Sequence, residues 1–172
     1  MSWHFRVTYV LAFLNYQLKK PWRQPRPAMP PYTLQISASQ NCDRAIETAQ
    51  AIRADGDPAF CAPADIPNLG TWYRIFIGRY PNHQAAAAAT RRLRKRFSDM
   101  RIVHQPWALA VDEITAESDR GKKKLFDMGC LPDPSCWLGA FATAQEAERL
   151  AATLGKIGID GRVIGPVNPE MP

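Results

Sequence analysis

The stretch from Trp72 to Tyr80 reads WYRIFIGRY and is the strongest strand signal in the chain. Aromatic and β-branched residues fill it, and successive side chains of a strand point to opposite faces. A helix is expected directly after it, because Asn82 can cap a run that continues to Phe97 with alanine and leucine on one side. A short strand from Met100 to Val103 then completes one strand–helix–strand half of a domain.

A similar half precedes this one. The segment from Tyr32 to Ser39 (YTLQISAS) alternates apolar and polar residues as a half-buried strand does. Cys42 to Asp55 has apolar residues at helical spacing, and Ala59 to Ala62 is predicted to be a short strand before the loop from Pro63 to Gly70. The order strand, helix, strand, strand, helix, strand predicts an α+β, ferredoxin-like split βαβ fold. This βαββαβ domain would have a four-stranded antiparallel sheet with two helices on one face.

The two central strands are expected to place a polar and aromatic group on the sheet face away from the helices. Alternation assigns Gln35 of the first strand to this face, together with Trp72, Arg74 and Phe76 of the third. Such a group suits a binding surface better than a core. Simpler interpretations remain open, since Trp72 could be buried under the N-terminal or C-terminal segment. Arg74 could form a structural salt bridge, and Gln35 could be a satisfied amide at the edge of the core.

These residues resemble the SPOR domain, a bacterial module of similar length. The family has an apolar-Gln-apolar pattern in its first strand, matched around Gln35, and an aromatic-x-Arg-apolar-x-apolar-Gly strand, matched by Trp72 to Gly78. The resemblance covers about residues 31–105, and a further half-unit over 135–165 is similar to part of it. The chain departs from the pattern at Ser37, where the family has glycine.

The resemblance implies a non-catalytic protein that binds septal peptidoglycan and prefers glycan strands without stem peptides. The positions that bind glycan in the family correspond to Gln35, Trp72 and Arg74. A sugar ring can lie on an indole, and its hydroxyl and acetamido groups need amide and guanidinium partners. We therefore expect a protein of the bacterial periplasm or cell envelope, either free or associated with the inner membrane, with a role in cell division or wall remodelling. Alternatively, the SPOR-like fold is an accessory subunit that contacts other envelope or membrane-complex proteins.

The remainder of the chain is expected to form separate parts around a domain at residues 32–106. Residues 1–20 are an apolar segment that is a docked helix, a weak membrane anchor or a signal peptide. Residues 21–31 contain five prolines and predict a stiff linker. A polar connector is expected over 107–123, followed by a degenerate SPOR-like ββαβ half-unit over 124–166.

The C-terminal half-unit is predicted from its likeness to the first domain. Leu138 to Phe141 leads into a helix as Ile77 to Tyr80 does, and a further strand is expected at Leu125 to Met128. Trp137 stands at the position of the family glutamine, so this copy is expected to pack rather than bind. Cys130 and Cys136 are spaced so that a turn could join them in a disulfide in an oxidising compartment.

The net charge and the motifs of the sequence narrow the classes of function that remain. The 172 residues include 22 Lys and Arg against 16 Asp and Glu, a net charge of +6 that favours anionic partners. The basic run over 91–96 is either a solvated face at a helix end or, together with residues 3–18, a membrane contact. An RNA-recognition module shares this strand order, but residues 72–77 lack its signature, so nucleic acid is disfavoured. Catalytic, metal and phosphate-loop motifs are absent from the sequence, which predicts no enzyme, no cofactor and no metal.

Overall fold

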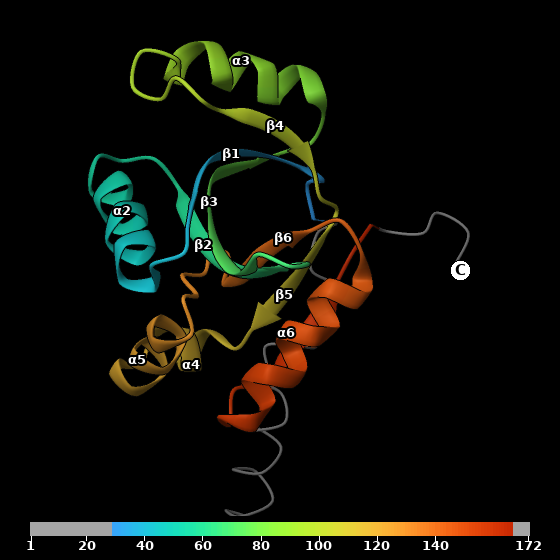
Figure 1. Cartoon of the computed structure of the whole chain (residues 1–172). Helices are drawn as coiled ribbons and strands as arrows, with labels where there is room; N and C mark the ends of the chain where they lie inside the picture. The colour runs from blue at the N-terminus through green and yellow to red at the C-terminus, as the bar shows by residue number, and fades with distance from the viewer. Residues whose placement is uncertain (1–28, 167–172) are drawn as a thin grey trace, which may run out of the picture.

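The computed structural model describes residues 29–166, and the predictions made for residues 1–28 lie outside them. The first unit has the predicted α+β class and element order (Figure 1). Its elements are β1 (Tyr32–Ser39), α2 (Cys42–Ala54), β2 (Ala59–Ile66), β3 (Gly70–Tyr80), α3 (His83–Leu93) and β4 (Arg101–His104). The four strands form a sheet in the order β2-β3-β1-β4 with antiparallel neighbours, so β1 and β3 lie in its centre as expected.

The helices of this unit begin where asparagine side chains can satisfy their free backbone N–H groups. Asn41 accepts a hydrogen bond from the Arg44 backbone N–H at 2.8 Å, and Asn82 accepts one from Ala85 at the same distance. Both helices then pack alanine, isoleucine and leucine side chains on one face of the sheet. The fully buried residues of this first core include Leu34, Ala45, Ala49, Ala59, Cys61, Ile75, Ile77 and Ala86.

A second unit follows without a connector. It consists of β5 (Trp107–Val111), α4 (Glu113–Glu117), α5 (Asp119–Asp127), β6 (Trp137–Phe141), α6 (Ala144–Lys156) and β7 (Gly161–Ile164). Its three strands have the order β6-β5-β7. The predicted connector is therefore wrong at residues 107–111, which form the central strand of this sheet. The predicted strand at Leu125–Met128 is also wrong, because Ser118 caps a helix that runs through Asp127 and buries Leu125.

The second sheet repeats the strand order of the first, with β6-β5-β7 in place of β3-β1-β4 and no named strand at the position of β2. The two halves also share one turn. Gly78 and Gly139 have φ angles of 66° and 68°, which favour glycine. A Cβ atom at either position would lie within 2.6 Å of the ring or hydroxyl of the aromatic residue two positions later, Tyr80 or Phe141. The sequence likeness between the two stretches thus reflects a common backbone geometry.

A buried ion pair joins the two units. Arg79 at the end of β3 pairs through Nε with Asp133 Oδ2, and the two side chains are 7% and 6% exposed. The Arg79 guanidinium also donates to the Gly139 carbonyl at 2.6 Å and lies 4.4 Å from the centre of the Phe60 ring. Burial lowers the pKa of Arg79, and the Asp133 carboxylate opposes that shift. The units therefore share one interior, with the second unit packed beneath the first sheet in Figure 1.

Three cysteines lie at or near this junction. The structure has no bond between Cys130 and Cys136, and a disulfide between them in an oxidising compartment stays a prediction. Cys130 is completely buried, and its thiol donates to the Met128 carbonyl oxygen at 3.7 Å. Its neighbour Leu131 exchanges backbone hydrogen bonds of 3.0 and 2.9 Å with Cys61 on β2. Burial raises the pKa of Cys61 to about 12 and raises that of Cys130 as well, so both thiols stay protonated.

Candidate functional site

The second unit covers part of the sheet face that was predicted to be open. Phe76 of β3 stacks on Phe60 of β2 with ring centroids 5.1 Å apart, and both pack against Ala140 of β6. Phe76 is only 1% exposed. Its expected place on an open binding face is corrected accordingly, because β6 makes this part of the face interior.

The part of the face toward β4 and the end of the β2–β3 hairpin remains accessible. Gln35 on β1 lies between Phe76 of β3 and Arg101 of β4, and its side chain is half-buried. Further along, Arg74 pairs with Ala38 on β1 and with Ala62 on β2, so it lies on the same face as Gln35. The structure thus brings two of the predicted residues to one partly open surface.

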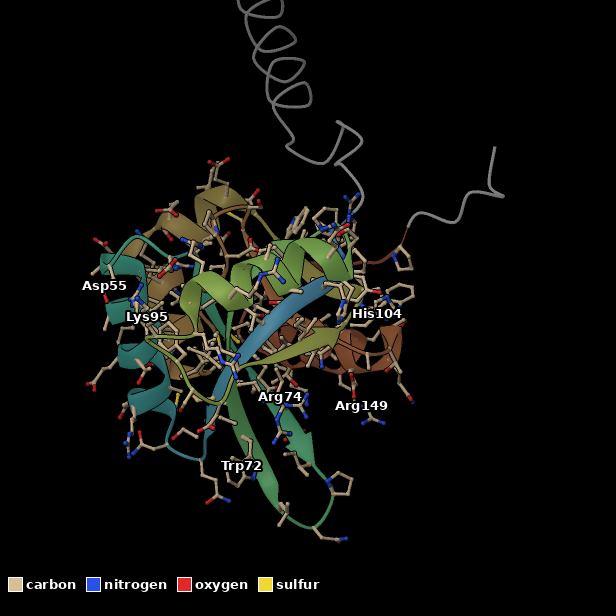
Figure 2. All side chains as sticks on the ribbon, turned by 90° about the horizontal axis from the view of Figure 1, so that it is seen from above. Asp55, Trp72, Arg74, Lys95, His104 and Arg149 are labelled. Atoms are coloured by element: carbon tan, nitrogen blue, oxygen red, sulfur yellow. The ribbon has the colours of Figure 1, made fainter. Side chains whose placement is uncertain are left out.

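Trp72 lies two residues before Arg74 on β3 and points to the same face, toward the tip of the hairpin (Figure 2). Its side chain is partly exposed. The indole N–H is shielded from solvent and has no acceptor among residues 29–166. An indole with part of its ring accessible can serve as a flat apolar platform.

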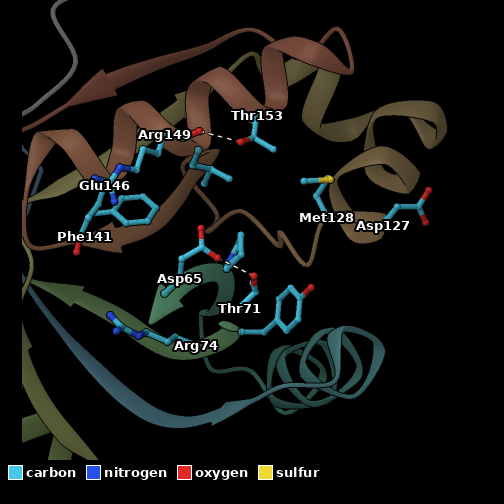
Figure 3. A pocket seen from close by; sticks show the side chains of 13 residues that line it. Asp65, Thr71, Arg74, Asp127, Met128, Phe141, Glu146, Arg149 and Thr153 are labelled. Carbon is cyan, nitrogen blue, oxygen red and sulfur yellow. Dashed lines mark hydrogen bonds between the residues drawn. The ribbon is translucent and has the colours of Figure 1, made fainter. Parts of the chain in front are cut away.

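Beside Arg74 the surface deepens into a pocket with a volume of about 320 Å³. The β2–β3 hairpin forms one wall, and α6 with the end of α5 forms the other (Figure 3). Arg74 contributes from the hairpin, while Arg149 and Glu146 contribute from α6. Sequence reasoning missed Arg149 because it is an ordinary exposed position of an amphipathic helix, and its role depends on where α6 packs.

Some of the charged side chains that line this pocket have hydrogen-bond or ion-pair partners, and others do not. Asp65 accepts a hydrogen bond from the Thr71 hydroxyl at 2.7 Å, and Glu146 accepts one from the Ala142 backbone N–H at 3.0 Å. Asp127 forms an ion pair with Lys123 at 3.2 Å. Arg74 and Arg149 have no side-chain partner within the described part of the chain. The pocket therefore offers guanidinium donors to a ligand, whereas its three carboxylates already have donors.

The basic run at the end of α3 is partly structural. Arg96 pairs with Asp57 and, at 2.7 Å, with Asp55, while Arg92 lies 3.6 Å from the buried Asp57. Arg91, Arg94 and Lys95 are exposed, and a membrane contact through this run remains a prediction. Between residues 29 and 166, no helix is long and apolar enough to cross a membrane. The same residues contain no cluster of three His, Cys, Asp or Glu side chains that could hold a metal.

Comparison with known proteins finds a family that the first unit resembles. Residues 28–102 match the family model of the SPOR domain, which covers the sheet from its first strand into β4. No curated protein and no solved structure matches the chain. SPOR domains are non-catalytic peptidoglycan-binding modules that occur in bacterial cell-envelope proteins and are associated with cell division. Residues 28–102 are therefore similar to the SPOR domain.

Proposed function

We propose that this protein binds the glycan strands of peptidoglycan in the bacterial periplasm, without catalysis, through Gln35, Trp72 and Arg74. The observation that carries the proposal is the SPOR-domain match over the same sheet that displays these three side chains. Strands without stem peptides are the preferred ligand, because a bare sugar backbone can approach a flat sheet surface closely. Cell division or wall remodelling is the corresponding cellular setting.

The chemistry of the three side chains supports this ligand. The exposed part of the Trp72 ring can stack on the apolar face of a sugar, and Gln35 offers both a donor and an acceptor to an acetamido group. Arg74 has no side-chain partner in residues 29–166, so its guanidinium can donate to ligand oxygens without breaking an internal ion pair. The sheet surface is accessible on the side of Ala38 and Arg101, which are both exposed.

A sedimentation assay with purified, protein-free sacculi tests the proposal. The wild type is expected to sediment with sacculi, and the double variant Gln35→Ala, Trp72→Ala is expected to stay in the supernatant. Gln84→Ala is the matched control, because Gln84 is an exposed glutamine on α3, on the opposite face of the sheet. Circular dichroism establishes that each variant is folded. A wild type that does not sediment contradicts the proposed function, and equal binding by the double variant contradicts the proposed site.

A protein-interaction role is the second candidate. The observation in its favour is that β6 already covers Phe60 and Phe76, which reduces the area left for a glycan. An accessory subunit of an envelope assembly would bind through the remaining surface around Arg74. In that case the wild type would not bind protein-free sacculi but would sediment with envelope membranes that keep their proteins.

A further inference from the structure

We infer that the pocket between the β2–β3 hairpin and α6 binds a carboxylate carried by the glycan, held between Arg74 and Arg149. The inference rests on the proposed glycan binding and adds a contact from outside the SPOR domain, since α6 belongs to the second unit. The second unit would thus take part directly in ligand selection.

The geometry of the pocket places the two arginines on facing walls. Arg74 projects from β3 and Arg149 from α6, and both line the same cavity of about 320 Å³. Figure 3 shows their guanidinium ends toward one end of the pocket, with Asp127 at the other end. This pocket is continuous with the predicted glycan surface through Arg74, which belongs to both.

The polar groups around the arginines indicate an anionic ligand. Asp65 already accepts a hydrogen bond from the Thr71 hydroxyl at 2.7 Å, and Glu146 accepts one from the Ala142 backbone N–H at 3.0 Å. Neither arginine forms an ion pair with them or with another residue between 29 and 166. A guanidinium presents a planar fork of N–H donors that matches the two oxygens of a carboxylate, and such charge-assisted pairs are the stronger hydrogen bonds.

The chemistry of the glycan supplies such a group. A muramic sugar that has lost its stem peptide exposes a free carboxylate where the peptide was attached by an amide. A carboxylate is negatively charged at neutral pH and accepts from two arginines, whereas an amide is neutral and continues into a peptide. Two unpaired arginines at the glycan surface would therefore favour stripped strands over peptide-bearing ones.

The test compares two forms of one ligand. Purified glycan chains without stem peptides are used either with free carboxylates or with these groups converted to neutral amides, and dissociation constants are measured by calorimetry. The wild type is expected to bind the free-carboxylate chains about tenfold more tightly. Arg149→Gln, which keeps a helix-compatible side chain, is expected to bind both forms equally. Lys156→Ala is the matched control, because Lys156 is an exposed cation on the same helix outside the pocket.

The outcomes separate this inference from the function on which it rests. A wild type that binds both chain forms equally, or an Arg149→Gln protein that keeps the tenfold preference, overturns the carboxylate site while glycan binding stands. A wild type that binds neither form overturns the proposed function and the inference together. Equal loss of preference in Lys156→Ala would show that general charge, rather than the pocket, causes the selectivity, and would also overturn the site.

Discussion

The buried pair of Arg79 and Asp133 makes a sharp prediction about how the two units depend on each other. Replacement of Asp133 by asparagine keeps an acceptor oxygen for the Ser135 and Trp137 backbone N–H groups, which lie 2.9 and 3.1 Å from Asp133 Oδ1. The loop before β6 should therefore retain its shape. The Arg79 guanidinium, however, loses its charge partner in a site where its side chain is only 7% exposed.

The expected cost follows from these contacts. Removal of one partner of a buried pair destabilises a protein by about 3–5 kcal/mol, because an uncompensated charge remains inside. Arg79 would keep its hydrogen bond to the Gly139 carbonyl at 2.6 Å and its place 4.4 Å from the Phe60 ring centre. A cation–π contact of this kind contributes about 0.5–2 kcal/mol. We therefore expect the lower end of the range, about 3 kcal/mol, for Asp133→Asn.

Urea unfolding followed by circular dichroism and tryptophan fluorescence measures this loss. The control is Asp127→Asn, because the pair of Asp127 with Lys123 is exposed and should contribute about 0.5 kcal/mol or less. The double variant Arg79→Met, Asp133→Asn should be less destabilised than the sum of the two single variants, since no unpaired charge remains. A loss below about 1 kcal/mol for Asp133→Asn, or additive effects in the double variant, would refute this account of the junction.

Three further changes test other parts of the fold. Burial raises the pKa of Cys61 from 9.0 to about 12, so the unfolded chain loses this thiol proton at a lower pH than the folded protein does. Between pH 8 and pH 10, the unfolding free energy measured with urea should therefore fall by roughly 1 kcal/mol more in the wild type than in Cys61→Ala. Phe76→Leu should cost about 1–2 kcal/mol in the same assay and leave sacculus binding unchanged, because Phe76 is 1% exposed; weaker binding by the folded variant would contradict the covered face. Gly139→Ala should lower the unfolding free energy by about 2 kcal/mol, because its Cβ would lie 2.3 Å from the Phe141 ring at a φ of 68°. Gly155→Ala in α6 should instead raise the unfolding free energy by about 0.5–1 kcal/mol, because nothing lies within 4 Å of its Cβ. Equal effects of the two substitutions would contradict this account.

The first unit was predictable because its signals are local. Alternation marks β1 and β3, and Asn41 and Asn82 start the two helices with a side chain that is itself readable from sequence. β5 was missed for the opposite reason. Ala108 to Val111 are all completely buried, so both faces of the strand are apolar and no alternation distinguishes it from a loop or a helix.

The site was predictable only in part, because coverage of a face is a tertiary property. Alternation correctly places Trp72, Arg74 and Phe76 on one face of β3, but it cannot show that β6 covers the last of them. The same limit applies to Arg149, whose helical position carries no signal until α6 lies against the hairpin.

The two arginines of β3 show how the second unit determines what this sheet can do. Strict alternation would place Arg79 on the opposite face from Arg74, toward the helices, because the two are an odd number of positions apart. The positive φ of Gly78 interrupts the alternation, and Arg79 instead lies against Phe60 and Asp133 on the face that β6 covers. One arginine thus holds the second unit in place, while the other remains without a side-chain partner among the described residues. Because the Arg79 contact helps to fix where α6 lies, it also helps to form the second wall of the pocket around Arg74. The second unit therefore reduces the open sheet surface and, in the same arrangement, forms a pocket beside it.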